Sequence, residues 1–195
     1  MKRSLMAMLL ASLVVSTALA QQKKAVPPPP KPKDEGPSLE VTMKFIQGKV
    51  NDIGIVAYIA YVHDNMAGGD STYQYKNEIS QVAGDASTCR ISYHWKKEVE
   101  WRVAVDSDQS FSLKDDVRDI AVMPVEQYQK EYDTAGGHPE FSYRIDPQVF
   151  ALDVHRTDKG TNVFYFIDEQ MANRVAKAMV HAVELCGGGA KPEPF

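Results

Sequence analysis

The most constraining feature of this chain is a long succession of strand-like segments, which starts near residue 55 and ends near residue 167. Apolar and polar residues alternate within them, and a period of two is typical of a half-buried strand. No helical segment alternates with these strands, so the sheet should be mostly antiparallel. We predict about seven strands, at residues 55–62, 73–82, 89–97, 99–105, 120–125, 150–156 and 162–167.

One helix is predicted on each side of this strand-rich region. Ser38 is a suitable N-cap for a helix over residues 38–51, and Asp168 for a helix over residues 168–186, with Gly187 as its C-cap. Apolar residues recur at helical spacing in both segments. They are Leu39, Met43, Ile46 and Val50 in the first, and Met171, Val175, Met179, Ala182 and Cys186 in the second.

These elements predict an α+β fold. About seven antiparallel strands should form a partly closed barrel or sandwich, capped by the C-terminal amphipathic helix, with an extra N-terminal helix. Three stretches rich in turn-forming residues are expected to interrupt the strands. They are a loop at residues 63–70, a break of the fourth strand at Asp106–Gln109, and a long loop at residues 127–147 with room for a short helix.

The N-terminus has the three parts of a cleavable secretory signal peptide over residues 1–20. Lys2 and Arg3 precede an apolar run at residues 5–15, and a small-x-small pattern predicts cleavage after Ala20. A membrane anchor is the alternative, but this run is shorter than the ~20 residues that span a bilayer. We therefore expect a periplasmic or secreted protein with no membrane span in its mature form.

Beyond the signal, the chain divides into three parts. Residues 21–37 form a proline-rich disordered linker, because they offer almost no apolar side chain to bury. Residues 38–187 form a single globular domain, and residues 188–195 a flexible tail. The formal net charge is −4, and removal of Lys2 and Arg3 makes it more negative. Such a protein has no general attraction for nucleic acid or anionic membranes.

Two cysteines, Cys89 and Cys186, are separated by 97 positions and belong to no CxxC motif. This spacing argues against a metal site. Both fall on predicted apolar faces, and disulfides persist outside the cytoplasm. We expect a Cys89–Cys186 disulfide between sheet and helix; two buried free thiols are the alternative.

No sequence motif assigns a catalytic, cofactor-binding or metal-binding residue. The chain contains no HExxH, GxSxG, P-loop or GxGxxG pattern. Two histidines, His94 and His155, fall on polar strand faces and are interpreted as surface residues. A hydrolase site assembled from distant residues would need them to meet Asp153 and a hydroxyl group in a pocket.

Three segments resemble a group of uncharacterised secreted bacterial proteins: residues 38–47, 89–95 and 171–178. The likeness covers most of residues 38–186. It implies a bacterial source and brings no activity or catalytic residue. The strand and helix order also resembles the pleckstrin-homology-like superfold, in topology only. A phosphoinositide site of that fold needs a basic first hairpin loop, whereas the loop here carries Asp64 and Asp70.

Aromatic residues are concentrated in the first four predicted strands, and they could line a groove for a protein, glycan or lipid ligand. Packing within the core and on the sheet faces is the simpler interpretation. With no catalytic motif, the leading hypothesis is a non-enzymatic extracytoplasmic binding or interaction module. The alternatives are the hydrolase and a structural envelope protein. The aromatic residues are Tyr58, Tyr61, Tyr73, Tyr75, Tyr93, Trp95 and Trp101.

Overall fold

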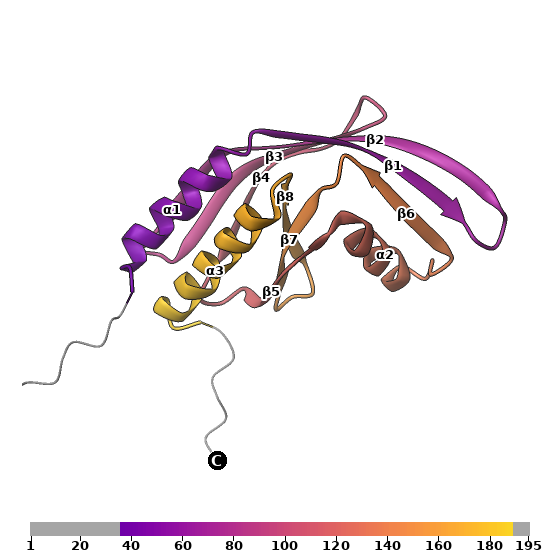
Figure 1. Ribbon diagram of the computed structural model, residues 1–195. Helices are drawn as coiled ribbons and strands as arrows, with labels where there is room; N and C mark the ends of the chain where they lie inside the picture. The colour runs from indigo at the N-terminus through magenta and orange to yellow at the C-terminus, as the bar shows by residue number, and fades with distance from the viewer. Residues whose placement is uncertain (1–35, 189–195) are drawn as a thin grey trace, which may run out of the picture. The chain divides into compact units, whose positions relative to one another are not determined.

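The computed structural model describes residues 36–188, and this part of the chain has the expected α+β class (Figure 1). The predicted signal peptide with its cleavage after Ala20, the linker as far as residue 35 and the tail from residue 189 lie outside the described residues. The elements are α1 (Leu39–Asn51), β1 (Ile55–Asp64), β2 (Gly69–Asp85), β3 (Arg90–Val99), β4 (Arg102–Ser112), β5 (Val117–Pro124), α2 (Val125–Ala135), β6 (Phe141–Asp146), β7 (Phe150–Arg156), β8 (Thr161–Phe166) and α3 (Glu169–Leu185).

The strands form two antiparallel sheets. The larger sheet has the order β4-β3-β2-β1-β6, and the smaller has the order β5-β7-β8. Figure 1 shows the larger sheet arching over the smaller one, with α1 and α3 at one end and α2 nearer the other. The arrangement is a sandwich and not a closed barrel, which decides between the two forms expected from the sequence.

Strands β7 and β8 of the smaller sheet are buried on both faces. Alternate residues of β7 and β8 enter two different apolar clusters: Leu152 and Phe164 pack with α1 and α3, whereas Ala151 and Tyr165 pack with β1 and α2. This double burial explains why β8 is apolar on successive positions instead of alternating. Each fully buried side chain of this size contributes about 1.5–3 kcal/mol of transfer free energy.

Both predicted helix caps form. The Ser38 side chain accepts the N–H of Val41, and the Asp168 carboxylate accepts the N–H groups of Gln170 and Met171. The buried stripes then dock the helices against the core and against each other. The stripe residues are Met43, Ile46 and Val50 in α1, and Ala172, Val175, Met179, Ala182 and Val183 in α3.

Several strand boundaries differ from the sequence-based expectation. The break predicted at Asp106–Gln109 is wrong, because β4 runs through it: Asp106 pairs with Lys96 and Asp108 with His94. β4 is an edge strand, where charged side chains reach solvent without cost. The loop predicted at residues 63–70 shrinks to a tight turn between β1 and β2.

The long loop predicted at residues 127–147 is wrong in part: the short helix allowed for in this segment is present, but a strand follows it. The segment contains most of α2 and an eighth strand, β6, which pairs with β1. Helix α2 buries only Val125 and is polar over most of its length, so few apolar residues mark it in the sequence. Its first-turn Glu126 accepts the N–H of Ile145 through Oε1 and thereby ties α2 to β6.

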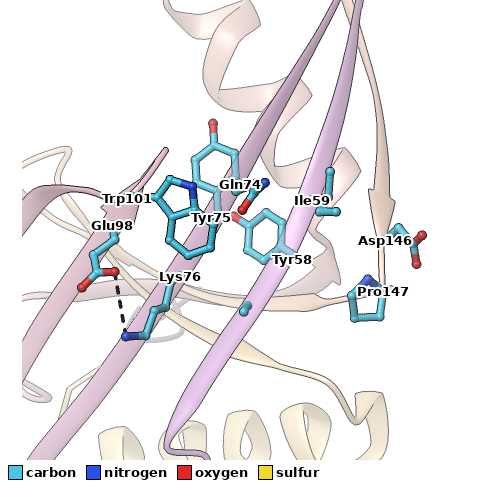
Figure 2. Close-up of a pocket in the computed structure, with 10 residues that line it drawn as sticks. Tyr58, Ile59, Gln74, Tyr75, Lys76, Glu98, Trp101, Asp146 and Pro147 are labelled. Atoms are coloured by element: carbon cyan, nitrogen blue, oxygen red, sulfur yellow. Dashed lines mark ion pairs between the residues drawn. The ribbon is translucent and has the colours of Figure 1, made fainter.

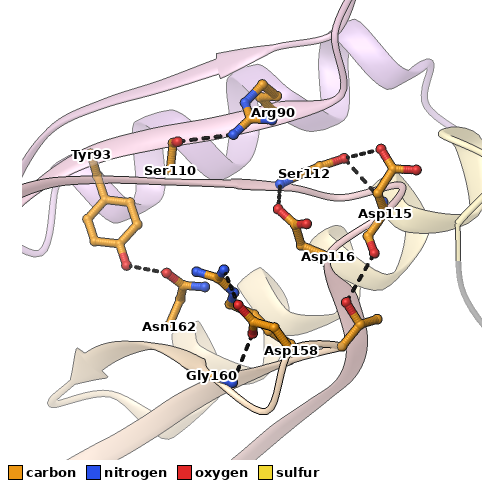
Figure 3. Close-up of polar contacts among 11 residues, drawn as sticks. Arg90, Tyr93, Ser110, Ser112, Asp115, Asp116, Asp158, Gly160 and Asn162 are labelled. Carbon is orange, nitrogen blue, oxygen red and sulfur yellow. Dashed lines mark hydrogen bonds and ion pairs between the residues drawn. The ribbon is translucent and has the colours of Figure 1, made fainter.

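Cys89 and Cys186 form a disulfide with their Cα atoms 6.0 Å apart. Cys89 lies just before β3 and Cys186 is the C-cap of α3, so the bond fastens the C-terminal end of this helix to the larger sheet. Gly187, expected at the left-handed position that ends the helix, follows Cys186 and has a φ of 72°. A polar contact also crosses between the sheets: the Tyr93 hydroxyl donates to Asn162 Oδ1 at 3.0 Å (Figure 3). No helix among residues 36–188 is both long and apolar enough to cross a membrane.

Candidate functional site

The connection between β3 and β4 is a two-residue turn made by Glu100 and Trp101. Both residues have positive φ, of 49° and 62°. Two-residue hairpins of this kind strongly favour Asn-Gly or Asp-Gly, because other side chains strain a left-handed backbone. Each such residue costs of order 1–3 kcal/mol. The turn nevertheless carries a tryptophan, and that side chain is 77% exposed.

The turn is fixed to β2 by a pair of hydrogen bonds. The Glu100 N–H donates to the Gln74 carbonyl oxygen at 3.0 Å. The Gln74 N–H donates in return to Glu100 Oε1 at 2.6 Å. The glutamate therefore supplies the acceptor that a longer β3 would have given, and Trp101 is presented at a defined place on the sheet.

Beside the turn lies a groove of about 350 Å³, which we call the Trp101 groove. Figure 2 shows Trp101 on one side of it and the β6 end on the other, with residues of β1 and β2 between them. The lining residues are Ala57, Tyr58, Ile59, Gln74, Tyr75, Lys76, Glu98, Trp101, Asp146 and Pro147.

The lining of the groove includes a carboxylate, Glu98, that is held by lysine side chains. Glu98 lies between two lysines, with its oxygens 3.0 Å from Lys96 Nζ and 3.8 Å from Lys76 Nζ. The Lys96 hydrogen bond is the main cause of a lowered Glu98 pKa, so this carboxylate is ionised at neutral pH. Gln74 and Asp146 add an amide and a second carboxylate. Such groups bind and orient a ligand.

Stacked tyrosines support the floor of the groove. The rings of Tyr58 and Tyr75, which face each other across β1 and β2, stack with centroids 5.0 Å apart. Tyr58 is buried, and Tyr165 of β8 lies against it at 6.2 Å. Burial raises the pKa of Tyr58 and of Tyr75. The ammonium of Lys97 lies 5.3 Å from the Tyr75 ring centroid, within cation–π distance. The Tyr75 ring therefore contacts both the Tyr58 ring and the Lys97 ammonium.

The aromatic residues singled out in the sequence therefore separate into distinct groups. Tyr58, Tyr75 and Trp101 line the Trp101 groove. Tyr93 belongs to the core, where burial raises its pKa, and Trp95 packs against the same cluster. The strand predicted over residues 99–105 included Trp101, and this is wrong because Trp101 lies in the turn between β3 and β4. The spacing of apolar residues in the sequence does not predict the two-residue turn that exposes Trp101.

The hydrolase candidates do not converge. His94 lies on the larger sheet, where its ring nitrogens contact Asp106 at 3.0 Å and Asp108 at 2.9 Å. His155 lies on the smaller sheet, with Nε2 3.1 Å from Asp153 Oδ2. The other ring nitrogen of His155, Nδ1, is 3.5 Å from the Arg118 guanidinium. A guanidinium is not a nucleophile, so this contact does not supply the hydroxyl group that a hydrolase site would need. The structure thus joins two of the three candidates and leaves His94 apart.

The carboxyl of Asp153 is buried, and burial is the main cause of its raised pKa. Across the part of the chain that the structure describes, no group of three or more His, Cys, Asp or Glu side chains is placed to hold a metal ion. No protein-family model, curated protein or solved structure matches this chain. The Trp101 groove is therefore the main structural guide to a function.

Proposed function

We propose that this protein is a non-enzymatic, extracytoplasmic binding module whose ligand lies in the Trp101 groove. The observation that carries the proposal is the exposed Trp101 side chain on a turn with two positive φ angles. A turn under selection for stability alone would carry glycine or asparagine at these positions. Backbone strain that glycine or asparagine would relieve is commonly found at functional sites.

The groove defines the chemistry of the ligand. An exposed indole gives a large, rigid contact area at low cost in conformational entropy, and tryptophan is enriched among the residues that dominate binding energies. Gln74 and Asp146 offer hydrogen bonds beside this apolar face. The ligand segment is therefore amphipathic, with one apolar face against Trp101 and hydrogen-bonding groups along the other side.

Its size supports a small ligand or a short segment of a larger one. The volume of about 350 Å³ falls at the lower end of the range of typical ligand sites. An extracytoplasmic location is supported by the Cys89–Cys186 disulfide and by the signal-like character of residues 1–20. The resemblance to secreted bacterial proteins points the same way.

The test is a panel of peptides, glycans and lipid vesicles probed with three proteins. Wild type, Trp101→Ala and Tyr132→Ala are compared; Tyr132 is the matched control, since it is also an exposed aromatic residue, at 62%, but does not line the groove. We expect at least one ligand class to bind wild type and Tyr132→Ala equally and Trp101→Ala at least tenfold more weakly. Equal binding of every retained ligand by all three proteins would refute the proposal.

A further inference from the structure

Strand β2 of the larger sheet is much longer than its neighbour β3. β2 covers 17 residues, but only residues 75–85 lie in the ladder with β3. Residues 69–73 pair with β1 alone. Figure 1 shows this part of β2 running on with β1 past the end of β3 and β4. The larger sheet therefore has an open edge along residues 69–73, which we call the β2 edge.

The β2 edge presents backbone groups that point away from β1. Both backbone groups at Gln74 engage Glu100 on the β3 side. In an antiparallel strand the hydrogen-bonding direction alternates from residue to residue, so Thr72 and Asp70 direct their N–H and C=O groups to that same side. Residues 69–73 are all exposed. Two donors and two acceptors are thus arranged as a template for a further strand.

The β2 edge lacks most devices that protect an edge from pairing. Native proteins commonly place proline, lysine or a β-bulge on such a strand. Residues 69–73 contain no proline and no lysine, and the irregularity of β2 lies far away, between Ser80 and Ala83. Their one charged residue is Asp70.

Two hollows flank the β2 edge, one on each face of the sheet. The outer hollow, about 440 Å³, is lined by Tyr61, His63, Thr72 and Arg144 among others. The inner hollow, about 460 Å³, lies between Tyr73 and the Phe141 and Tyr143 side chains of β6. Because successive side chains of a strand point to opposite faces, an added strand would direct alternate residues toward these two surfaces.

The inner hollow carries negatively charged side chains and no positively charged lysine or arginine. Its lining includes Asp64 and Asp133. Asp70 borders it too, but the Asp70 side chain lies on the outer face, where its Oδ1 is 2.8 Å from His63 Nδ1. Asp133 accepts the hydroxyl of Tyr143, and Asp64 Oδ1 accepts the N–H groups of Met66 and Ala67. These contacts orient the carboxylates without supplying a permanent cation. A lysine or arginine directed into the inner hollow would complement them.

We infer that the β2 edge binds an extended, basic peptide segment of a partner protein by strand addition. The backbone groups of Asp70 and Thr72 form the hydrogen bonds, and alternate lysine or arginine side chains of the partner face the inner hollow. A second copy of this chain is a poorer occupant, because the residues 69–73 that it would add contain no lysine or arginine to face Asp64 and Asp133. The inference adds a second site to the proposed binding module and does not depend on the Trp101 groove.

The test uses two capped eight-residue peptides, one of alternating lysine and valine and one of alternating glutamate and valine. Amide exchange is followed by NMR at each peptide concentration. We expect the lysine peptide to protect the N–H groups of Asp70 and Thr72, and to leave those of Ser71 and Tyr73 unchanged because they already face β1. No protection at residues 70 and 72, or equal protection by the glutamate peptide, overturns the inference.

Two variants separate the possible causes. Thr72→Pro removes one backbone N–H donor on the open side of an edge strand, where proline is tolerated. It should weaken binding of the lysine peptide at least tenfold. Asp133→Lys leaves the β2 backbone intact and reverses a charge of the inner hollow, and it should weaken binding of the lysine peptide similarly even if Thr72→Pro folds poorly. Binding that survives Asp133→Lys unchanged overturns the inference, as does protection of residues 70 and 72 that depends on protein concentration without peptide. Trp101→Ala should bind the lysine peptide normally, so failure of the Trp101 groove and failure of the β2 edge give different results.

Discussion

Removal of the Cys89–Cys186 disulfide should cost this protein a large part of its stability. The bond closes a loop with a sequence separation of 97 residues. In the chain-entropy model a loop of that length restricts the unfolded chain by about 4–5 kcal/mol. Domains of this size are typically stable by about 5–15 kcal/mol, so the double variant Cys89→Ala/Cys186→Ala should fold only marginally.

The assay is urea unfolding followed by circular dichroism, with free energies extrapolated to water. We expect a loss of about 4–5 kcal/mol in the double variant, and a similar loss for wild type held in reductant. The slope of the free energy against urea should rise, since the unfolded chain without the cross-link exposes more surface. A loss below about 1 kcal/mol would refute the reasoning, because the disulfide would then add little to the packing of α3.

Three further outcomes follow from the local structure. Gly48→Ala should stabilise the protein by about 1 kcal/mol in thermal or urea unfolding, because position 48 is inside α1 with nothing within 4 Å of an added Cβ; a destabilised variant would contradict this. Gly188→Ala should destabilise it, because its Cβ would lie 2.6 Å from the Leu113 carbonyl oxygen. NMR titration should give His94 a pKa above its ordinary value, mainly through the Asp108 hydrogen bond, and Asp108→Asn should lower that pKa. The stability that His94 contributes should be complete below its unfolded pKa and be lost as the pH rises through its folded pKa; an unshifted His94 would contradict the contact.

The regular elements were predictable because their patterns reflect burial on one side. The caps at Ser38 and Asp168 and the apolar stripes of α1 and α3 can be read directly from the sequence, and they form as expected. The antiparallel arrangement followed from the absence of a repeating strand-helix alternation; α2 does lie between two strands, but it connects β5 of the smaller sheet to β6 of the larger one. The missed elements carry weaker patterns. In β6, Phe141, Tyr143 and Ile145 do alternate, but the neighbouring glycines and prolines conceal a strand of six residues.

The Trp101 groove was only partly predictable. Clustering of aromatic residues in the first strands pointed to a possible binding surface, and three of those residues do line the groove. The position of Trp101 depends on where β3 ends, and Glu100-Trp101 has none of the usual turn chemistry. The β2 edge was equally hidden, because it results from a difference in strand length that appears only when registers are known.

The most direct test of the proposed function is the fluorescence of Trp101 itself. The chain has two tryptophans, so Trp95→Phe leaves Trp101 as the single reporter. Since Trp101 is exposed, ligands retained in the panel should shift its emission to shorter wavelength in a saturable manner, as the indole leaves water. Unchanged emission of Trp101 at saturating concentrations of a bound ligand would contradict the assignment of the groove as the binding site.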